Sequence, residues 1–273
     1  MKKTASSCLL VLVLLCCLCS RVAAEEYTLS MPPLFPVERL TAMLHPLAAR
    51  LSKETGNNIR LLVTENIDQY MTEALHGNIV IGYENPSLYV HISNVHQALV
   101  SAVTAEHDTR SGGIIISRPE AGISGLKDLQ GKKIMIVGRE SAGGFLSQKL
   151  TLKEQGIDVE QDCRLTEAAN QREENVILSV SIGDVDAGFI SEYALHTADQ
   201  YIRPGSVTVV ARTARLPNWV VSLSRDMPQV QKDDIREALL GLGPDAPALK
   251  ALGISGFTKA SDADYDIIRD ILE

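Results

Sequence analysis

Four small residues in the middle of the chain have the types and spacing that suit anion binding. Ser141, Ala142, Gly143 and Gly144 follow an apolar run and precede apolar residues at helical spacing over 145–152. Backbone N–H groups at a helix N-terminus lack partners within the helix, and the helix dipole favours negative charge there. Ser141 suits the N-cap position. The segment therefore predicts either a cradle for an oxyanion or an ordinary connection from a strand to a helix.

The residues around this turn predict the elements that position it. A short helix is expected after Ser124, and Lys132 and Lys133 then lead into the apolar run 134–137, the pattern of a strand buried on both faces. The Lys-Ser/Thr pair of a phosphate-binding NTPase loop is missing from this stretch, as are GxGxxG and the GxSxG of a nucleophile elbow. The segment therefore does not indicate ATP or GTP chemistry.

The N-terminal part of the chain alternates between strand and helix patterns. Strands are expected at 27–31, 59–63 and 79–83, and helices at 37–55 and 68–76. Leu40, Leu44, Leu47 and Leu51 share one face of the first helix, and Gly56 is expected to end it. This alternation predicts an α/β fold in which the carboxyl ends of parallel strands meet at one sheet edge.

A second α/β unit begins near residue 114, with strands at 114–117, 134–137 and 186–190 and a helix at 175–181. A strand at 207–211 is expected to return to the first unit, and the chain from 232 onward to be mainly helical. These patterns predict a first lobe of residues 25–110 and 209–273 and a second lobe of residues 111–208. Each lobe should contain a mainly parallel sheet flanked by helices, with a two-strand hinge and a ligand cleft between the lobes.

The first 24 residues have the pattern of a secretory signal peptide. Lys2 and Lys3 precede an apolar run, and small residues end at Ala24, so cleavage after Ala24 and a soluble periplasmic protein are expected. An uncleaved N-terminal anchor is the alternative. Cleavage would leave Cys163 as the single cysteine, without a disulfide or a thiolate metal cluster.

Charge narrows the choice of partners. Without the three basic residues of segment 1–24, the 26 Lys and Arg of the chain become 23, against 34 Asp and Glu, which gives a formal charge of −11. Such a balance argues against a nucleic-acid partner or an anionic membrane surface. The six histidines show no spacing typical of metal ligands, and no cofactor is expected.

Several stretches, in order along the chain, resemble the substrate-binding proteins of phosphate-, phosphite- and phosphonate-type ABC importers, which have the type II periplasmic-binding fold. They are PLAARLSKETG (46–56), LHGNIVIGYENPSLY (75–89), SGLKDLQGKKIMIVGRESAGGF (124–145), GDVDAGFISEYAL (183–195) and ARLPNWVV (214–221). The resemblance covers nearly the whole chain after residue 24. Its more specific part combines Tyr70, the Tyr-x-Asn-Pro-Ser sequence that starts at Tyr83, and the glycine turn that starts at Ser141.

The resemblance implies a set of ligand-binding residues. In that family, hydroxyl and backbone donors at the helix start bind the oxyanion, and the matching positions here are Ser141, Ala142, Gly143 and Gly144. Only one hydroxyl remains among them. The family's phosphonate binders tend to carry a His where this chain has Glu173 beside Arg172.

Aromatic, amide and acidic residues complete the expected site. Tyr70, Tyr83 and Trp219 either line the cleft or fill the core, and Asn85 lies in the matched strand end. Glu84, Glu140, Glu173 and Glu192 fall at strand or turn ends, where they could bind the amino group of a zwitterion or point into solvent.

Three functions remain open from the sequence. The resemblance implies a monomeric, non-enzymatic binding protein that captures a small anionic or zwitterionic ligand and delivers it to an ABC permease in the inner membrane, by closing its lobes. A ligand sensor for a membrane receptor kinase would need the same cleft. An exported hydrolase that uses Ser141 is a third possibility, although no His and Asp partners can be assigned.

Overall fold

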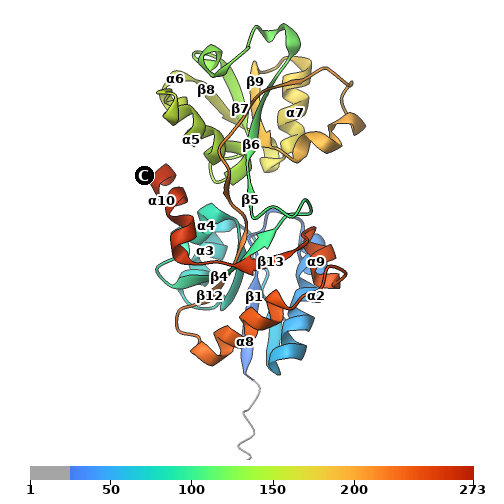
Figure 1. Cartoon of the computed structure of the whole chain (residues 1–273), viewed down its shortest axis with the longest axis vertical. Coiled ribbons are helices and arrows are strands. Elements are labelled where there is room, and N and C mark those ends of the chain that lie inside the picture. Colours follow the sequence, from blue (N-terminus) through green and yellow to red (C-terminus); the bar gives the residue numbers. More distant parts are fainter. Residues whose placement is uncertain (1–24) are drawn as a thin grey trace, which may run out of the picture.

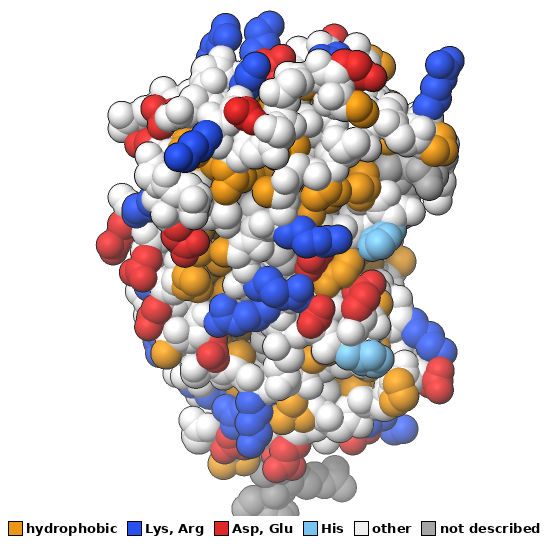
Figure 2. Space-filling model, turned by 45° about the horizontal axis from the view of Figure 1, so that its top comes forward, with side chains coloured by type: hydrophobic (Ala, Val, Ile, Leu, Met, Phe, Trp, Pro, Cys, Tyr) orange, Lys and Arg blue, Asp and Glu red, His pale blue; other side chains and the backbone are white. Residues whose placement is uncertain are grey.

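The computed structural model describes residues 25–273, except for the side chains of 197–199, and the expected signal peptide at 1–24 lies outside the described residues. Two sheets, each flanked by helices, form two lobes that lie one above the other in Figure 1, joined by a small two-stranded sheet. On the face shown in Figure 2, charged side chains of both signs are interspersed with small groups of hydrophobic ones. In the described chain, no helix combines the length and hydropathy that crossing a membrane requires.

The first lobe is built on a six-stranded sheet in the order β13-β4-β12-β3-β1-β2. Its core contains the apolar face of α2, on which Leu40, Leu44, Leu47 and Leu51 are buried, and the helix ends at Gly56 with φ 72°, as the sequence predicts. The strands are β1 (Glu26–Ser30), β2 (Asn58–Leu61), β3 (Ile81–Glu84), β4 (His96–Val103), β12 (Val220–Ser224) and β13 (Gly256–Lys259). The helices are α2 (Val37–Thr55), α3 (Ile67–Leu75), α4 (Pro86–Ile92), α8 (Gln229–Leu240) and α9 (Pro247–Leu252). Helix α10 (Asp266–Leu272) contacts α4 of this lobe, whereas its Ile268 and Ile271 are buried in the core of the second lobe.

The second lobe is built on a five-stranded sheet in the order β10-β6-β9-β7-β8. The apolar run 134–137 contributes to β7, the strand between β9 and β8, and its isoleucines are fully buried, as a strand covered on both faces requires. The strands are β6 (Gly113–Ser117), β7 (Lys133–Ile136), β8 (Arg164–Glu167), β9 (Ala187–Ser191) and β10 (Thr208–Arg212). The helices are α5 (Ser147–Glu154), α6 (Val159–Asp162) and α7 (Glu173–Ile182).

The expectation of mainly parallel sheets needs a correction, because both sheets are mixed. In the first sheet β1 pairs in parallel with β2 and β3, whereas β12 pairs antiparallel with β3 and β4, and β13 antiparallel with β4. In the second, β7 is parallel to β8 and β9, whereas β6 is antiparallel to β9 and β10. The physical reason is that β6 and β12 follow the two crossings between the lobes. Each enters its sheet from the cleft side and therefore runs antiparallel to the neighbouring strand, whose carboxyl end lies at the cleft.

The return crossing also falls later than the sequence predicts. Strand β10, expected to lead back into the first lobe, pairs with β6 at the edge of the second sheet. The hinge pair is β5 (Arg110–Ser111) with β11 (Leu216–Pro217). Directly after β11, the side chain of Asn218 donates hydrogen bonds to the carbonyl oxygens of Ala102 and Asp108. A boundary at residue 208/209 therefore falls inside β10 and does not separate the two sheets.

Candidate functional site

A cavity of about 990 Å³ lies between the lobes at the carboxyl ends of their parallel strands. In the first lobe, its lining follows β1, β2 and β3 and precedes β12, and in the second lobe it follows β7, β8 and β9. Ligands of open α/β sheets bind at such strand ends. The lining residues are Pro33, Leu34, Phe35, Pro36, Arg39, Glu65, Asn66, Ile67, Asp68, Asn85, Pro86, Ser111, Val137, Glu140, Ser141, Ala142, Gly143, Asn170, Gln171, Arg172, Glu173, Glu174, Ser191, Tyr193, Pro217, Asn218 and Trp219.

The turn after β7 forms part of the second lobe's wall. Ser141 is the N-cap residue, and its Oγ accepts a hydrogen bond of 3.0 Å from the N–H of Gly144. A π-helical turn over Ala142–Leu146 follows and runs directly into α5. As the first two residues of this helix, Ala142 and Gly143 have N–H groups without a partner inside it. Both residues line the cavity, so the turn can offer two backbone donors and one hydroxyl to an anion.

The glycines of this turn are required by packing. A Cβ at Gly143 would lie 2.9 Å from the Cβ of Ser191 on β9, and one at Gly144 would lie 2.4 Å from Cγ2 of Val137. Gly144 is buried and lies behind the lining, and its N–H already donates to Ser141. The small residues therefore let the helix start lie against two strand ends, and of the two glycines only Gly143 reaches the cavity.

Glu173 stands beside this turn at the start of α7. Its Oε1 accepts a hydrogen bond of 2.7 Å from the N–H of Ser191, and burial raises the pKa of its carboxyl. The preceding Asn170 and Gln171 also line the cavity and have positive φ values of 55° and 52°. An acidic group thus lies close to the donors of the turn.

The first lobe contributes Asn85 and Trp219 to the cavity. Asn85 caps α4, its Oδ1 accepting from the N–H of Leu88 at 2.9 Å, which leaves its Nδ2 free to donate. Trp219 is partly buried, with its ring centroid 5.2 Å from that of Tyr83. The Trp therefore does both things that the sequence allowed: it lines the cavity and packs on the core.

Besides Gly144, three expected ligand residues lie outside the lining. Tyr70, on α3, is fully buried, and its hydroxyl donates to Oε1 of Glu84 on β3 at 2.7 Å. Tyr83 lies behind Trp219, in the core of the first lobe. Glu192 points to the hinge, where it accepts from the N–H of Gly112 at 3.2 Å and pairs with Arg215 at 3.3 Å.

Glu84 is a buried acid rather than a cleft acid. Its side chain is fully buried next to Asn85, and desolvation raises its pKa to about 8, against the hydrogen bonds from Tyr70 and Ser222, which lower it. Ser222 Oγ in turn lies 2.7 Å from Nδ1 of His96, whose Nε2 lies 3.0 Å from the carbonyl oxygen of Ile79. Burial lowers the pKa of His96 to about 4.

Glu140 links the two lobes across one side of the cavity. It follows β7, and its carboxylate accepts a hydrogen bond from Ser87 on α4 and lies 3.4 Å from Nε2 of His91. The hydrogen bond with Glu140 raises the pKa of His91, and the same bond lowers the pKa of Glu140. The lobes are therefore in direct contact while the cavity keeps its volume.

The sequence missed the lining that follows β1 and β2. Phe35, Arg39, Glu65 and Asp68 belong to it, and their only signal was their position after predicted strands. With these residues the lining holds more acids than bases. The charged lining residues are Arg39 and Arg172 against Glu65, Asp68, Glu140, Glu173 and Glu174.

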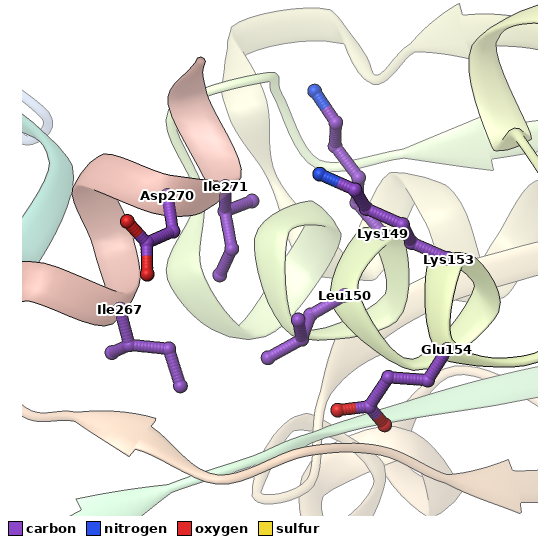
Figure 3. Close-up of a pocket in the computed structure, with 7 residues that line it drawn as sticks. All are labelled: Lys149, Leu150, Lys153, Glu154, Ile267, Asp270 and Ile271. Atoms are coloured by element: carbon purple, nitrogen blue, oxygen red, sulfur yellow. The ribbon is translucent and has the colours of Figure 1, made fainter.

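A second, smaller cavity of about 270 Å³ lies between α5 and α10. Figure 3 shows its apolar lining, Leu150 from α5 with Ile267 and Ile271 from α10. It contains none of the residues expected to bind a ligand. Among the side chains that the structure describes, no three of His, Cys, Asp or Glu lie close enough together to hold a metal ion.

Comparison with known proteins assigns the chain to a family. The model of the family described as "ABC transporter, phosphonate, periplasmic substrate-binding protein" matches residues 29–265. The chain belongs to this family. Both lobes and the hinge lie inside the match, and members of the family are the substrate-binding component of a transporter.

Individual relatives agree with this membership. The phosphate-import protein PhnD of Mycolicibacterium smegmatis is 22% identical over 278 residues, which span 91% of this chain and 85% of the relative. The structure of PhnD1 from Prochlorococcus marinus in complex with methylphosphonate has a TM-score of 0.72 at 14% identity, over 90% of this chain and 97% of that one. A Xanthomonas citri protein bound to ATP has a TM-score of 0.73 at 18% identity, over 91% and 96% of the two chains. These structures share the type II periplasmic-binding fold, as the sequence predicts.

Proposed function

We propose that the protein captures a small oxyanion or zwitterion with a phosphate- or phosphonate-like head in the cavity between its lobes and delivers it to an ABC permease. The observation that carries the proposal is the turn at Ser141, which presents backbone and hydroxyl donors at the wall of an inter-lobe cavity in a member of this family. The names of the relatives support the ligand class: one imports phosphate, and another was solved with methylphosphonate. No bond of the ligand is broken, since binding and lobe closure suffice for delivery.

The proposed ligand contacts follow from the lining. The head binds Ser141 and the N–H groups of Ala142 and Gly143, with Asn85 donating from the other lobe. Glu173 and Trp219 complete the contacts, the first toward a proton or amino group of the ligand and the second toward its carbon substituent. Tyr70, Tyr83, Gly144 and Glu192 support the walls and the hinge without reaching the ligand.

The test is titration calorimetry with methylphosphonate and with inorganic phosphate. Ser141→Ala should weaken binding by about 1.5–3 kcal/mol, the range for a hydrogen bond to a charged group. Ser181→Ala, on α7 and away from the cavity, is the matched control and should bind like the wild type. Wild-type protein that binds neither compound, nor the larger phenylphosphonate, would refute the proposed ligand class.

We further propose that the mature protein is a periplasmic monomer that begins at Glu25. The apolar run and the small residues before Glu25 support removal of segment 1–24 by a signal peptidase. Mass spectrometry of the protein from the periplasmic fraction tests the cleavage site, and a lipidated Cys16, Cys17 or Cys19 would contradict it. Membership of a transporter family favours delivery to a permease over the sensor role.

A further inference from the structure

The first lobe's side of the cavity carries a group of apolar residues that the oxyanion does not explain. We call it the apolar wall; it consists of Pro33, Leu34, Phe35, Pro36, Pro217 and Trp219. Phe35 and Trp219 are partly buried against the core of the first lobe. β1 runs parallel to β3 and β12 antiparallel to it, so the loop after β1 and the residues before β12 meet at one sheet edge.

The backbone around the apolar wall is restricted. Prolines flank the Leu34-Phe35 pair on both sides and fix φ in this loop, which lowers the entropy cost of holding the pair at the cavity. The guanidinium of Arg39 lies 4.3 Å from the ring centroid of Phe35 and also lines the cavity. A guanidinium plane can itself stack on an aromatic ring, so Arg39 extends the surface available to a flat apolar group.

The opposite wall, in the second lobe, is mainly polar around the turn. It presents Ser141, Asn170, Gln171 and Glu173 beside the backbone donors of the turn. An inorganic anion would use this wall and leave the apolar wall in contact with water, so it would gain none of the free energy that burying this apolar area provides. The cavity therefore suits a ligand with two unlike ends.

The volume of the cavity supports the same conclusion. About 990 Å³ is at the upper end of the roughly 300–1,000 Å³ that hold drug-sized ligands. The lobes already touch through Ser87 and Glu140, so this space is present in a structure whose lobes are in contact. A single tetrahedral anion would fill a small part of it.

From these observations we infer that the ligand is an organic phosphonate or phosphate ester whose apolar or aromatic body packs against the apolar wall, rather than inorganic phosphate or phosphite. The inference rests on the proposed function, because the head of the ligand binds at the turn. It adds that much of the selectivity lies in the first lobe, at Phe35 and Trp219, and not in the donors of the second.

Two probes with the same head and different bodies test it. Titration calorimetry compares phenylphosphonate with methylphosphonate, and we expect phenylphosphonate to bind at least tenfold more tightly. Trp219 is the single Trp of the chain, so its fluorescence reports contact with the wall. Phenylphosphonate should change this fluorescence at saturation considerably more than methylphosphonate does.

A variant tests the contribution of the apolar wall to affinity separately from that of the ligand's head. Phe35→Ala should lower the affinity for phenylphosphonate at least fivefold and the affinity for methylphosphonate less than twofold. Val230→Ala is the control. It shortens an apolar side chain that is 69% exposed on α8 and should leave the affinity for both phosphonates unchanged. The wild-type comparison needs no variant, so it remains decisive if Phe35→Ala folds poorly.

The possible results have distinct meanings. Equal affinity of wild-type protein for the two phosphonates overturns the inference and leaves the proposed function standing. An equal loss of affinity for the two phosphonates in Phe35→Ala has the same meaning. Absence of binding to both phosphonates and to phosphate overturns the proposed function and the inference together.

Discussion

Replacing the buried acid Glu84 with Gln should change how the stability of the protein depends on pH. Glu84 is fully buried, and its pKa of about 8 lies far above the 4.5 expected for an exposed Glu. Between these two pH values the folded protein binds a proton that the unfolded chain does not. The free energy of unfolding therefore falls as pH rises through this window, by about 1.36 kcal/mol per pH unit.

Hydrogen-bond geometry around Glu84 favours the protonated acid. The carbonyl of Ile79 can only accept, so Nε2 of His96 carries a proton, and the lowered pKa of this His leaves its Nδ1 as an acceptor near neutral pH. The single proton of Ser222 then satisfies Nδ1, 2.7 Å away. Ser222 Oγ also lies 3.1 Å from Oε1 of Glu84, so its one proton has two possible acceptors, and a neutral Glu84 loses less than a carboxylate when Nδ1 takes that proton.

His96 has the opposite effect on how stability depends on pH, and this determines the pH range in which the effect of Glu84 can be measured. Its pKa falls from 6.5 to about 4 on folding, so below pH 6.5 the unfolded chain binds the extra proton and stability rises with pH. The two effects largely cancel between pH 4.5 and 6.5. Between pH 6.5 and 8 only Glu84 of this network changes its protonation on folding. The free energy of unfolding should therefore fall by about 2 kcal/mol over this range.

Glu84→Gln removes the titrating group and keeps an oxygen to accept from Tyr70. Urea denaturation of both proteins at several pH values measures the difference in free energy of unfolding. This difference should shift by about 2 kcal/mol in favour of the variant between pH 6.5 and 8. Glu120→Gln, at an exposed position, is the control and should leave the curve parallel to the wild type. Parallel curves for Glu84→Gln would show that Glu84 is ionised in the folded protein and would refute the reasoning.

Three further outcomes follow from the contacts. Tyr70→Phe should lower the free energy of unfolding by about 1–3 kcal/mol in chemical denaturation, because the buried acceptor Glu84 loses a donor, and calorimetry should find ligand affinity unchanged. Asn218→Ala should cost about 2–4 kcal/mol and lower the melting temperature, since two hinge carbonyls lose their donor; an unchanged melting temperature would contradict this role. Replacing His91 with Ala should raise the pKa of Glu140, seen by NMR titration as a midpoint closer to that of an exposed Glu, and an unmoved midpoint would exclude the pair in solution.

Local patterns in the sequence determined the elements that position the turn at Ser141. The apolar spacing of α2 and Gly56 at its end predicted this helix to the residue, because helical period and a left-handed C-cap are properties of a short segment. The strand 134–137 and the helix start at Ser141 were predicted for the same reason. Charge, the resemblance and the alternation of elements were sufficient for the family and the two-lobed class of fold.

Tertiary structure decided which side chains face the cavity. Tyr70 and Glu84 were candidates for the cleft, yet both are fully buried and form a hydrogen bond with each other in the core. Glu192 faces the hinge because Arg215 and the N–H of Gly112 lie there. The residue types allow either orientation, and the choice depends on segments more than ten residues away in the sequence.

What the sequence by itself determined is therefore the set of elements and the polar turn that begins at Ser141. Only the tertiary structure decided the pairing of β10 with β6, the entry of β12 beside β3, and with it the meeting of Phe35 and Trp219 at one cavity. The physical reason is that strand direction and sheet order depend on contacts between distant segments. A period of two or 3.6 residues does not encode such contacts.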